Sequence, residues 1–215
     1  MNIFAIGDSH CIFFYDSKNI KNHWVGWGGM PVTMYQFIEQ GLPLYNIVER
    51  LPPGDICDIN IKENDIVLFY YGWNDVQRNV KKNSINDSDY IEMIDKLVNN
   101  YIEIIKAYSN GNKYKIRPIV SCVYPITINT KDSIIGTNEE RIQYTSYMNY
   151  LLQIKCIENN IPFFDIYNIL HNNNIISQNV VDDDGVHLDR KNTDLREIIE
   201  KELFEICKLH YNEII

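Results

Sequence analysis

Residues 65–75 read Asp-Ile-Val-Leu-Phe-Tyr-Tyr-Gly-Trp-Asn-Asp, a hydrophobic run that ends at a glycine followed by tryptophan, asparagine and aspartate. A run this short and this continuously hydrophobic is typical of a strand buried on both faces, as the strands of a parallel sheet are. We therefore expect residues 65–71 to form a strand that is buried on both faces. Gly72 then begins the loop at its carboxyl end.

Four further hydrophobic runs lie on either side of this stretch and are predicted to be strands of the same sheet. They are Ile3–Ile6, His23–Val25, Ile116–Val123 and Ile161–Asp165. The sequence thus predicts a sheet of about five strands.

Three long amphipathic stretches are predicted to be helices, at residues 90–105, 138–159 and 192–210. In each of them hydrophobic side chains recur at helical spacing, and Asp87 or Ser88 is placed to cap the first. Short buried strands that alternate with such helices are typical of the α/β class with a parallel sheet. The side chains of the second helix that are expected to face the core are Ile142, Tyr144, Met148, Leu151, Leu152 and Ile154.

The composition narrows the class of protein further. The chain has 215 residues, of which 45% are hydrophobic, and this length favours a single domain spanning residues 1–215. Its 29 acidic and 20 basic side chains give a formal net charge of −9, and the basic ones are scattered. Nucleic acids and anionic membranes need a concentrated positive field, so neither is an expected partner. A small neutral ligand fits better.

Cysteine usage and hydropathy indicate the compartment. No hydrophobic run approaches the roughly 18 residues needed to cross a bilayer, and the N-terminus lacks the features of a signal peptide. The cysteines form no Cys-x-x-Cys pair, so neither a disulfide framework nor a zinc site is indicated. We expect a cytoplasmic chain with reduced thiols. Nothing in the sequence indicates its oligomeric state. The cysteines are Cys11, Cys57, Cys122, Cys156 and Cys207.

Polar segments follow several predicted strands, at the edge where open parallel sheets bind ligands. Residues 7–10 read Gly-Asp-Ser-His after the first strand, residues 26–29 read Gly-Trp-Gly-Gly after the second, and residues 72–75 read Gly-Trp-Asn-Asp after the third. Residues 184–187, Asp-Gly-Val-His, precede the last helix. Because the carboxyl ends of parallel strands share one edge, we expect these segments to converge.

Together the segments supply the parts of serine acyl chemistry. Ser9, in a tight turn, is the expected nucleophile, and His187 is the expected base that takes its proton. Asp184 lies three residues before His187, where it could accept a hydrogen bond from Nδ1–H and leave Nε2 towards Ser9. These three residues form the predicted catalytic triad.

An oxyanion hole needs donors that are already in place. The backbone N–H groups of Ser9 and Gly29 and the side-chain amide of Asn74 are the expected donors, with Gly28 as the alternative to Gly29.

Three further side chains are expected to line the cleft and bind substrate. Trp27 and Trp73 border the predicted site, and aromatic faces suit sugar rings or acyl chains, although ordinary core or rim contacts explain them equally well. His10 follows Ser9 directly, so it could line the pocket but is a poor base for its neighbour. Four histidines have no acid at the spacing that pairs Asp184 with His187, and we expect them to be structural or exposed: His10, His23, His171 and His210.

Each motif also has a simpler interpretation when taken alone. Ser9 could cap a helix, Gly28-Gly29 could form a turn, and Asn74-Asp75 could bond its own loop. Residues 182–184 could form a solvated acidic loop or, with Asp189, a weak cation site, although calcium-loop spacing is lacking. The joint occurrence of the motifs in chain order favours the catalytic interpretation. We expect no metal and no cofactor. Asp8 and Asp75 are expected to hold loops together by hydrogen bonds rather than to react.

The four segments, in this order, resemble the motif blocks of the SGNH or GDSL-like esterases and lipases: Gly-Asp-Ser, a glycine after the second strand, Gly-x-Asn-Asp and Asp-x-x-His. The likeness spans about residues 3–190. It implies a three-layer α/β/α sandwich of the flavodoxin-like type and makes Gly29 the glycine donor of the oxyanion hole. Two departures stand out, since His10 replaces the leucine of the GDSL subgroup, and residues 30–33 replace a commoner Asp- or Ser-rich continuation.

The resemblance implies a metal-independent serine esterase whose substrate carries a short acyl group, such as an O-acetyl on a carbohydrate. One alternative is an O-acyltransferase that uses the same residues with a sugar acceptor, because exclusion of water decides between the two. Another is a catalytically silent carbohydrate-binding module, because the fold alone does not settle function.

Overall fold

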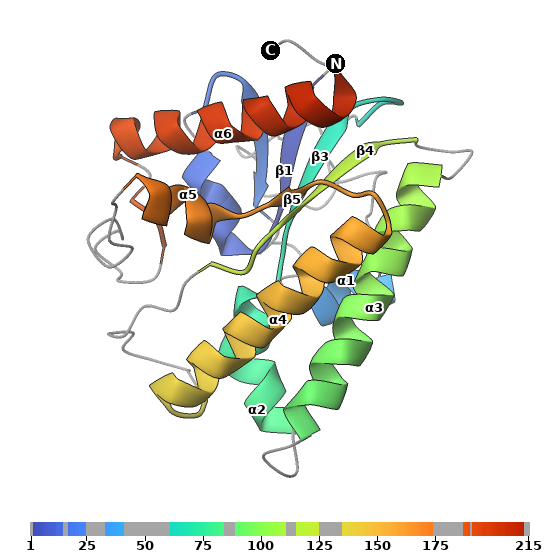
Figure 1. Ribbon diagram of the computed structural model, residues 1–215, viewed down its shortest axis with the longest axis vertical. Helices are drawn as coiled ribbons and strands as arrows, with labels where there is room; N and C mark the ends of the chain where they lie inside the picture. Colours follow the sequence, from blue (N-terminus) through green and yellow to red (C-terminus); the bar gives the residue numbers. More distant parts are fainter. Residues whose placement is uncertain are drawn as a thin grey trace, which may run out of the picture.

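The computed structural model describes residues 2–14, 17–24, 33–40, 61–83, 89–110, 115–124, 135–173, 187–189 and 191–212. Within these ranges five strands form one sheet in the order β2-β1-β3-β4-β5, and every neighbouring pair is parallel (Figure 1). The predicted parallel sheet of about five strands is therefore confirmed. The strands are β1 (Ile3–Gly7), β2 (Ile20–Trp24), β3 (Ile66–Tyr70), β4 (Arg117–Ser121) and β5 (Phe163–Phe164).

The hydrophobic run of residues 65–71 contains the central strand β3. All of its residues are buried, and it pairs with β1 on one side and β4 on the other. Its amino end is fixed by Asp65, whose carboxylate accepts hydrogen bonds of 2.7 and 2.8 Å from the backbone N–H groups of Asn2 and Lys62. This order of strands is the flavodoxin-like one, in which the ligand crevice lies at the carboxyl ends of β1 and β3.

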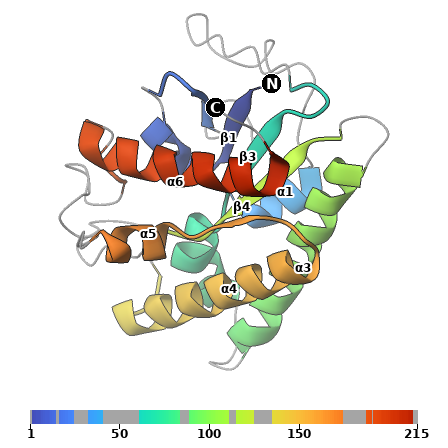
Figure 2. The ribbon, with the colours of Figure 1, turned by 45° about the horizontal axis from the view of Figure 1, so that its top comes forward.

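Helices cover both faces of the sheet, so the protein has three layers: helices, sheet and helices. Helices α1 (Met34–Gln40), α3 (Asp89–Asn110) and α4 (Asn138–Glu158) share one face, because the chain crosses the sheet in the same direction each time and such crossovers are right-handed. Helix α3 packs against both α1 and α4. Helix α5 (Ile166–Asn172) packs against α6 (Thr193–Tyr211), which crosses β1 and β3 (Figure 2). The three-layer α/β/α sandwich is confirmed.

The long helices α4 and α6 begin at residues whose side chains cap the first turn. Helix α4 begins with a capping box, in which the Thr137 side chain accepts from the Glu140 N–H and the Glu140 carboxylate accepts from the Thr137 N–H. Asn192 caps α6 by accepting a 3.0 Å hydrogen bond from the Leu195 N–H. The expected caps of α3, Asp87 and Ser88, lie outside the described residues.

Two expectations about these elements were wrong. Ile142 was expected to face the core, but 50% of its surface is exposed, because α4 instead buries a stripe at four-residue spacing: Tyr144, Met148, Leu152 and Cys156. In addition, β2 begins at Ile20, three residues before the predicted strand. Helices α1 and α5 were not predicted, nor was the helical segment after Asn74 made of the π-helical turn η3 (Asp75–Asn79) and α2 (Val80–Asn83).

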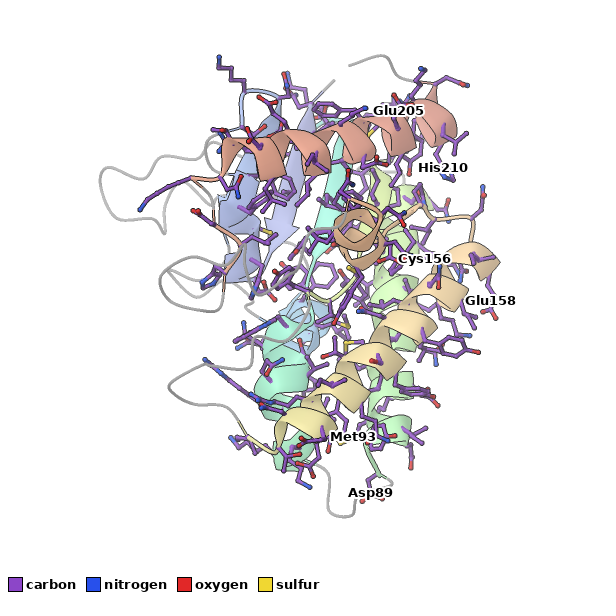
Figure 3. All side chains as sticks on the ribbon, turned by 60° about the vertical axis from the view of Figure 1, so that its left-hand side comes forward. Asp89, Met93, Cys156, Glu158, Glu205 and His210 are labelled. Carbon is purple, nitrogen blue, oxygen red and sulfur yellow. The ribbon has the colours of Figure 1, made fainter. Side chains whose placement is uncertain are left out.

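The side chains follow this layering. Figure 3 shows Cys156 on the inner side of α4 and Glu158 on its outer side, and Cys156 is fully buried. His210 is exposed on α6, as expected. None of the described helices combines the length and the apolar composition needed to cross a membrane.

Candidate active site

The close approach of β1 and β3 places the proposed nucleophile at the carboxyl edge of the sheet. A Cβ atom on Gly7 would overlap the carbonyl oxygen of Tyr70 in the neighbouring strand, so only glycine fits there. The same carbonyl accepts a 3.0 Å hydrogen bond from the backbone N–H of Asp8. The chain then leaves the sheet, and Ser9 begins the 3-10 helix η1 (Ser9–Phe14).

Asp8 and His10 form a buried pair on either side of Ser9. The Oδ1 atom of Asp8 lies 3.1 Å from Nδ1 of His10 and also accepts a 3.0 Å hydrogen bond from the His10 backbone N–H. Both side chains are 1% exposed. The Asp-x-x-His spacing does not reveal this partner, because the turn at Ser9 brings Asp8 to His10 at a spacing of two residues. A buried His10 agrees with the expected structural role. The expectation that Asp8 holds its loop by hydrogen bonds is confirmed.

The ring of His10 lies among aromatic rings from three other segments. Its centroid is 6.4 Å from that of Tyr70 at the end of β3, 5.0 Å from Trp73, and 5.7 Å from Tyr124 after β4. It is 4.8 Å from the ring of His187, which belongs to the segment before α6. The first, third and fourth sequence blocks thus meet at one edge of the sheet, as the motif analysis predicted.

The third block contributes Asn74 and Asp75, which differ in role. The side chain of Asn74 makes no capping hydrogen bond to η3. Asp75 is buried, and its carboxylate accepts hydrogen bonds from the backbone N–H groups of Met34, at 2.7 Å, and Tyr35, at 3.4 Å. It therefore fixes the first turn of α1 to the loop after β3, which confirms the expected structural role.

Burial also changes the acidity of Asp75. Desolvation raises its pKa from the usual 3.8 to about 7, against the lowering effect of the hydrogen bonds from Met34 and Tyr35, and the nearby Asp8 charge adds to the rise. The carboxyl of Asp75 consequently titrates near neutral pH.

Several predicted site residues cannot be placed relative to the carboxyl edge of the sheet. The side chain of Ser9 and the whole of Trp27, Gly28, Gly29 and Asp184 lie outside the described part of the chain. Trp73 is 6% exposed and packs on His10, so its contact with the core is clear while its contact with a substrate stays a prediction.

A separate cavity of about 760 Å³ lies between α1, α3 and the segment formed by η3 and α2. One of its lining residues is Met93 of α3, which Figure 3 labels. Among the described residues that line this cavity, Asp75 is the one that belongs to a predicted motif. The cavity is therefore not the place where the sequence blocks meet. Within the described ranges no three His, Cys, Asp or Glu side chains are grouped so as to hold a metal ion.

The fold and this edge define an α/β protein of the flavodoxin-like type in which His10 and His187 lie side by side at the topological switch point of the sheet. No protein-family model matches the sequence, and no curated protein matches it.

Solved structures do share the fold. A GDSL-like lipase from Bacteroides thetaiotaomicron is 18% identical over 95% of this chain and 87% of its own, with a TM-score of 0.56. A lipolytic protein of the G-D-S-L family from Veillonella parvula is 15% identical over 100% of both chains, with a TM-score of 0.55. An acetyl xylan esterase is 17% identical over 94% of this chain and 98% of its own, with a TM-score of 0.51. The chain therefore has the fold of the GDSL-like, or SGNH, hydrolases.

Proposed function

We propose that this chain is a serine esterase of the SGNH type. The observation that carries the proposal is the 4.8 Å separation between the rings of His187 and His10, because His10 directly follows Ser9. A base that takes the proton of Ser9 must lie at this edge of the sheet. The fold brings His187 there from the other end of the chain.

The proposed reaction proceeds through an acyl-enzyme. The Oγ atom of Ser9 bonds to the carbonyl carbon of an ester while its proton passes to His187. The bond from that carbon to the alkoxy oxygen then breaks, and His187 returns the proton to the leaving alcohol. Water adds to the acyl-enzyme with the same help from His187, which releases the acid and regenerates Ser9. Asp184 holds His187 and stabilises its protonated form.

The oxyanion of each tetrahedral intermediate needs donors. The N–H groups next to Ser9 are occupied, since Asp8 donates to Tyr70, His10 donates to the Asp8 side chain, and Cys11 donates 3.1 Å to the Asp8 carbonyl. The Ser9 N–H is the donor we assign to the oxyanion, and Gly29 and the Asn74 amide complete the proposed hole.

A short-chain acyl ester of a carbohydrate, such as an O-acetyl group, is the proposed substrate. One of the solved structures with this fold is an acetyl xylan esterase. The net charge of −9 favours a neutral ligand over an anion. Trp73 is nearly buried, so we assign it to the floor of the cleft and Trp27 to the stacking face, whereas the buried His10 is assigned no contact with the substrate.

Hydrolysis of p-nitrophenyl acetate by wild type and Ser9→Ala tests the proposal. Ser9→Ala should lose at least about a thousandfold in kcat, and Ser146→Ala, which changes an exposed serine on α4, should keep the wild-type rate. Wild-type activity in Ser9→Ala would contradict the mechanism. With an O-acetylated sugar as substrate, free acetate supports hydrolysis, whereas acetyl transfer to an added sugar supports the acyltransferase.

A further inference from the structure

We propose that Asp8 and His10 form a buried pair that holds the ring of His187 in place and supplies it with a nearby negative charge. Both are then positioning residues, because they act on the reaction through His187. The inference rests on the proposed function in so far as His187 is the base of that reaction.

The pair is rigid and cannot easily turn away from His187. The Asp8 N–H is bonded to Tyr70, and one carboxylate oxygen of Asp8 faces both the backbone N–H and Nδ1 of His10. The rings of Tyr70, Trp73 and Tyr124 also lie next to the His10 ring, with centroids 6.4, 5.0 and 5.7 Å from it. His187 therefore packs against a ring that is itself fixed to the first and third strands.

The hydrogen-bond pattern assigns the proton on His10. A carboxylate only accepts, so Nδ1 carries the hydrogen and donates to Asp8. The Nε2 atom of His10 and the Oδ2 atom of Asp8 are buried and have no hydrogen-bond partner among the described residues. A proton on Nε2 would be a buried donor without an acceptor, which is costly. The pair therefore directs the Nδ1–H of His10 at the Asp8 carboxylate, and this carboxylate is the negative charge that we assign to the pair.

The other titratable groups around the pair do not cancel this charge. Burial raises the pKa of the Cys11 thiol and of the Tyr70 and Tyr124 hydroxyls well above their usual values, so these groups are neutral near pH 7. Asp75 senses the Asp8 charge and has a pKa raised to about 7 by burial. Among the described groups that face His10, the carboxylate of Asp8 is therefore the one to which we assign a charge. His187 contacts the His10 ring as well.

A negative charge one ring away favours the protonated form of His187. His187 takes on a positive charge when it accepts the proton of Ser9, so the Asp8 carboxylate would stabilise the transition state as well as raise the basicity of the free imidazole. This contribution would add to that of Asp184, the residue proposed to hold His187 in the triad.

The pH profile of kcat/KM for p-nitrophenyl acetate tests the inference, because its acid limb reports the base in the free enzyme. Asp8→Asn keeps an oxygen for both His10 donors and removes only the charge. Its acid limb should move down by about one pH unit, a tenfold change in proton affinity. Asp65→Asn removes a buried carboxylate at the opposite end of β3 and should leave the profile in place. An Asp75→Asn profile identifies any limb that belongs to Asp75.

A second variant and a second readout separate the possible failures. His10→Phe keeps a ring against His187 but removes the Nδ1 donor, and should lower kcat about tenfold with KM little changed. NMR titration of the His187 ring, assigned with His187→Gln, should show a lower pKa in Asp8→Asn whether or not the protein is an esterase. An unchanged acid limb and an unchanged His187 titration in Asp8→Asn would overturn the inference. An active Ser9→Ala variant would instead overturn the proposed function.

Discussion

The backbone N–H of Met34 donates a 2.7 Å hydrogen bond to the carboxylate of Asp75. This contact joins the start of α1, which follows the glycine block in the sequence, to the loop after the central strand β3. Asp75 is buried, and desolvation holds its pKa near 7. The hydrogen bond that holds the start of α1 to the loop after β3 therefore involves a carboxyl group that titrates near neutral pH.

Asp75→Asn should change how the stability depends on pH. The folded protein binds a proton at Asp75 between its usual pKa of 3.8 and about 7, whereas the unfolded chain does not. Wild type therefore loses stability as the pH rises across this window, by at most about 4 kcal/mol. Asp75→Asn lacks this term, so its stability relative to wild type should rise from pH 4 to pH 7.5. Urea unfolding at both pH values measures the difference, and a pH-independent difference would refute the assignment.

Gly7→Ala should be strongly destabilising, because the new methyl group would overlap the Tyr70 carbonyl, which is backbone and cannot move aside cheaply. We expect a loss of about 3 kcal/mol or more, or failure to fold. Ala5→Gly is the matched control in the same strand and should cost about 1 kcal/mol. Urea denaturation compares them. A Gly7→Ala protein within about 1 kcal/mol of wild type would show that β1 and β3 do not approach as described.

The capping box of α4 gives a third prediction. Thr137→Ala removes the acceptor for the Glu140 N–H and should cost about 1 kcal/mol. Glu140→Gln keeps an oxygen for the Thr137 N–H and loses only the 2.6 Å ion pair with Lys81, which is partly exposed and should matter less. Thermal unfolding ranks the two variants, and the reverse order would argue against the capping box.

The thiols should be unreactive in the folded protein. Cys11, Cys122, Cys156 and Cys207 are buried free thiols, and desolvation raises the pKa of Cys122 and Cys156 to about 12. Because the thiolate is the reacting form, an aromatic disulfide reagent at pH 8 should modify at most the remaining Cys57 quickly. Unfolding in guanidinium should expose all 5 cysteines. Rapid native reaction of two or more thiols would contradict the described burial.

The sequence predicted the sheet well because its central strands are buried on both faces and read as unbroken hydrophobic runs. It was less accurate for β2, an edge strand in which Lys21 and Asn22 interrupt the hydrophobic pattern. Helix α1 was missed because part of its N-terminal cap comes from Asp75, far away in the sequence. Ile142 was misplaced because a hydrophobic side chain alone does not show which side of a helix meets its neighbours.

The motif order predicted which segments meet at the site, but not which side chains touch. Strand order and parallel direction follow from local patterns, so the meeting of the segments that carry His10, Trp73 and His187 at one edge could be expected. The pairing of His10 with Asp8 depends on the turn that starts η1, and the contact with His187 depends on how the C-terminal segment packs. Neither is visible in spacing alone.

Covalent labelling with a fluorophosphonate, located by mass spectrometry, tests most directly the claim that Ser9 is a nucleophile activated by His187. We expect one label per chain on Ser9, none in Ser9→Ala, and at least about a hundredfold slower labelling in His187→Ala. Ser146→Ala should label like wild type. No label on wild type, a label on another residue, or labelling of His187→Ala at the wild-type rate would contradict it.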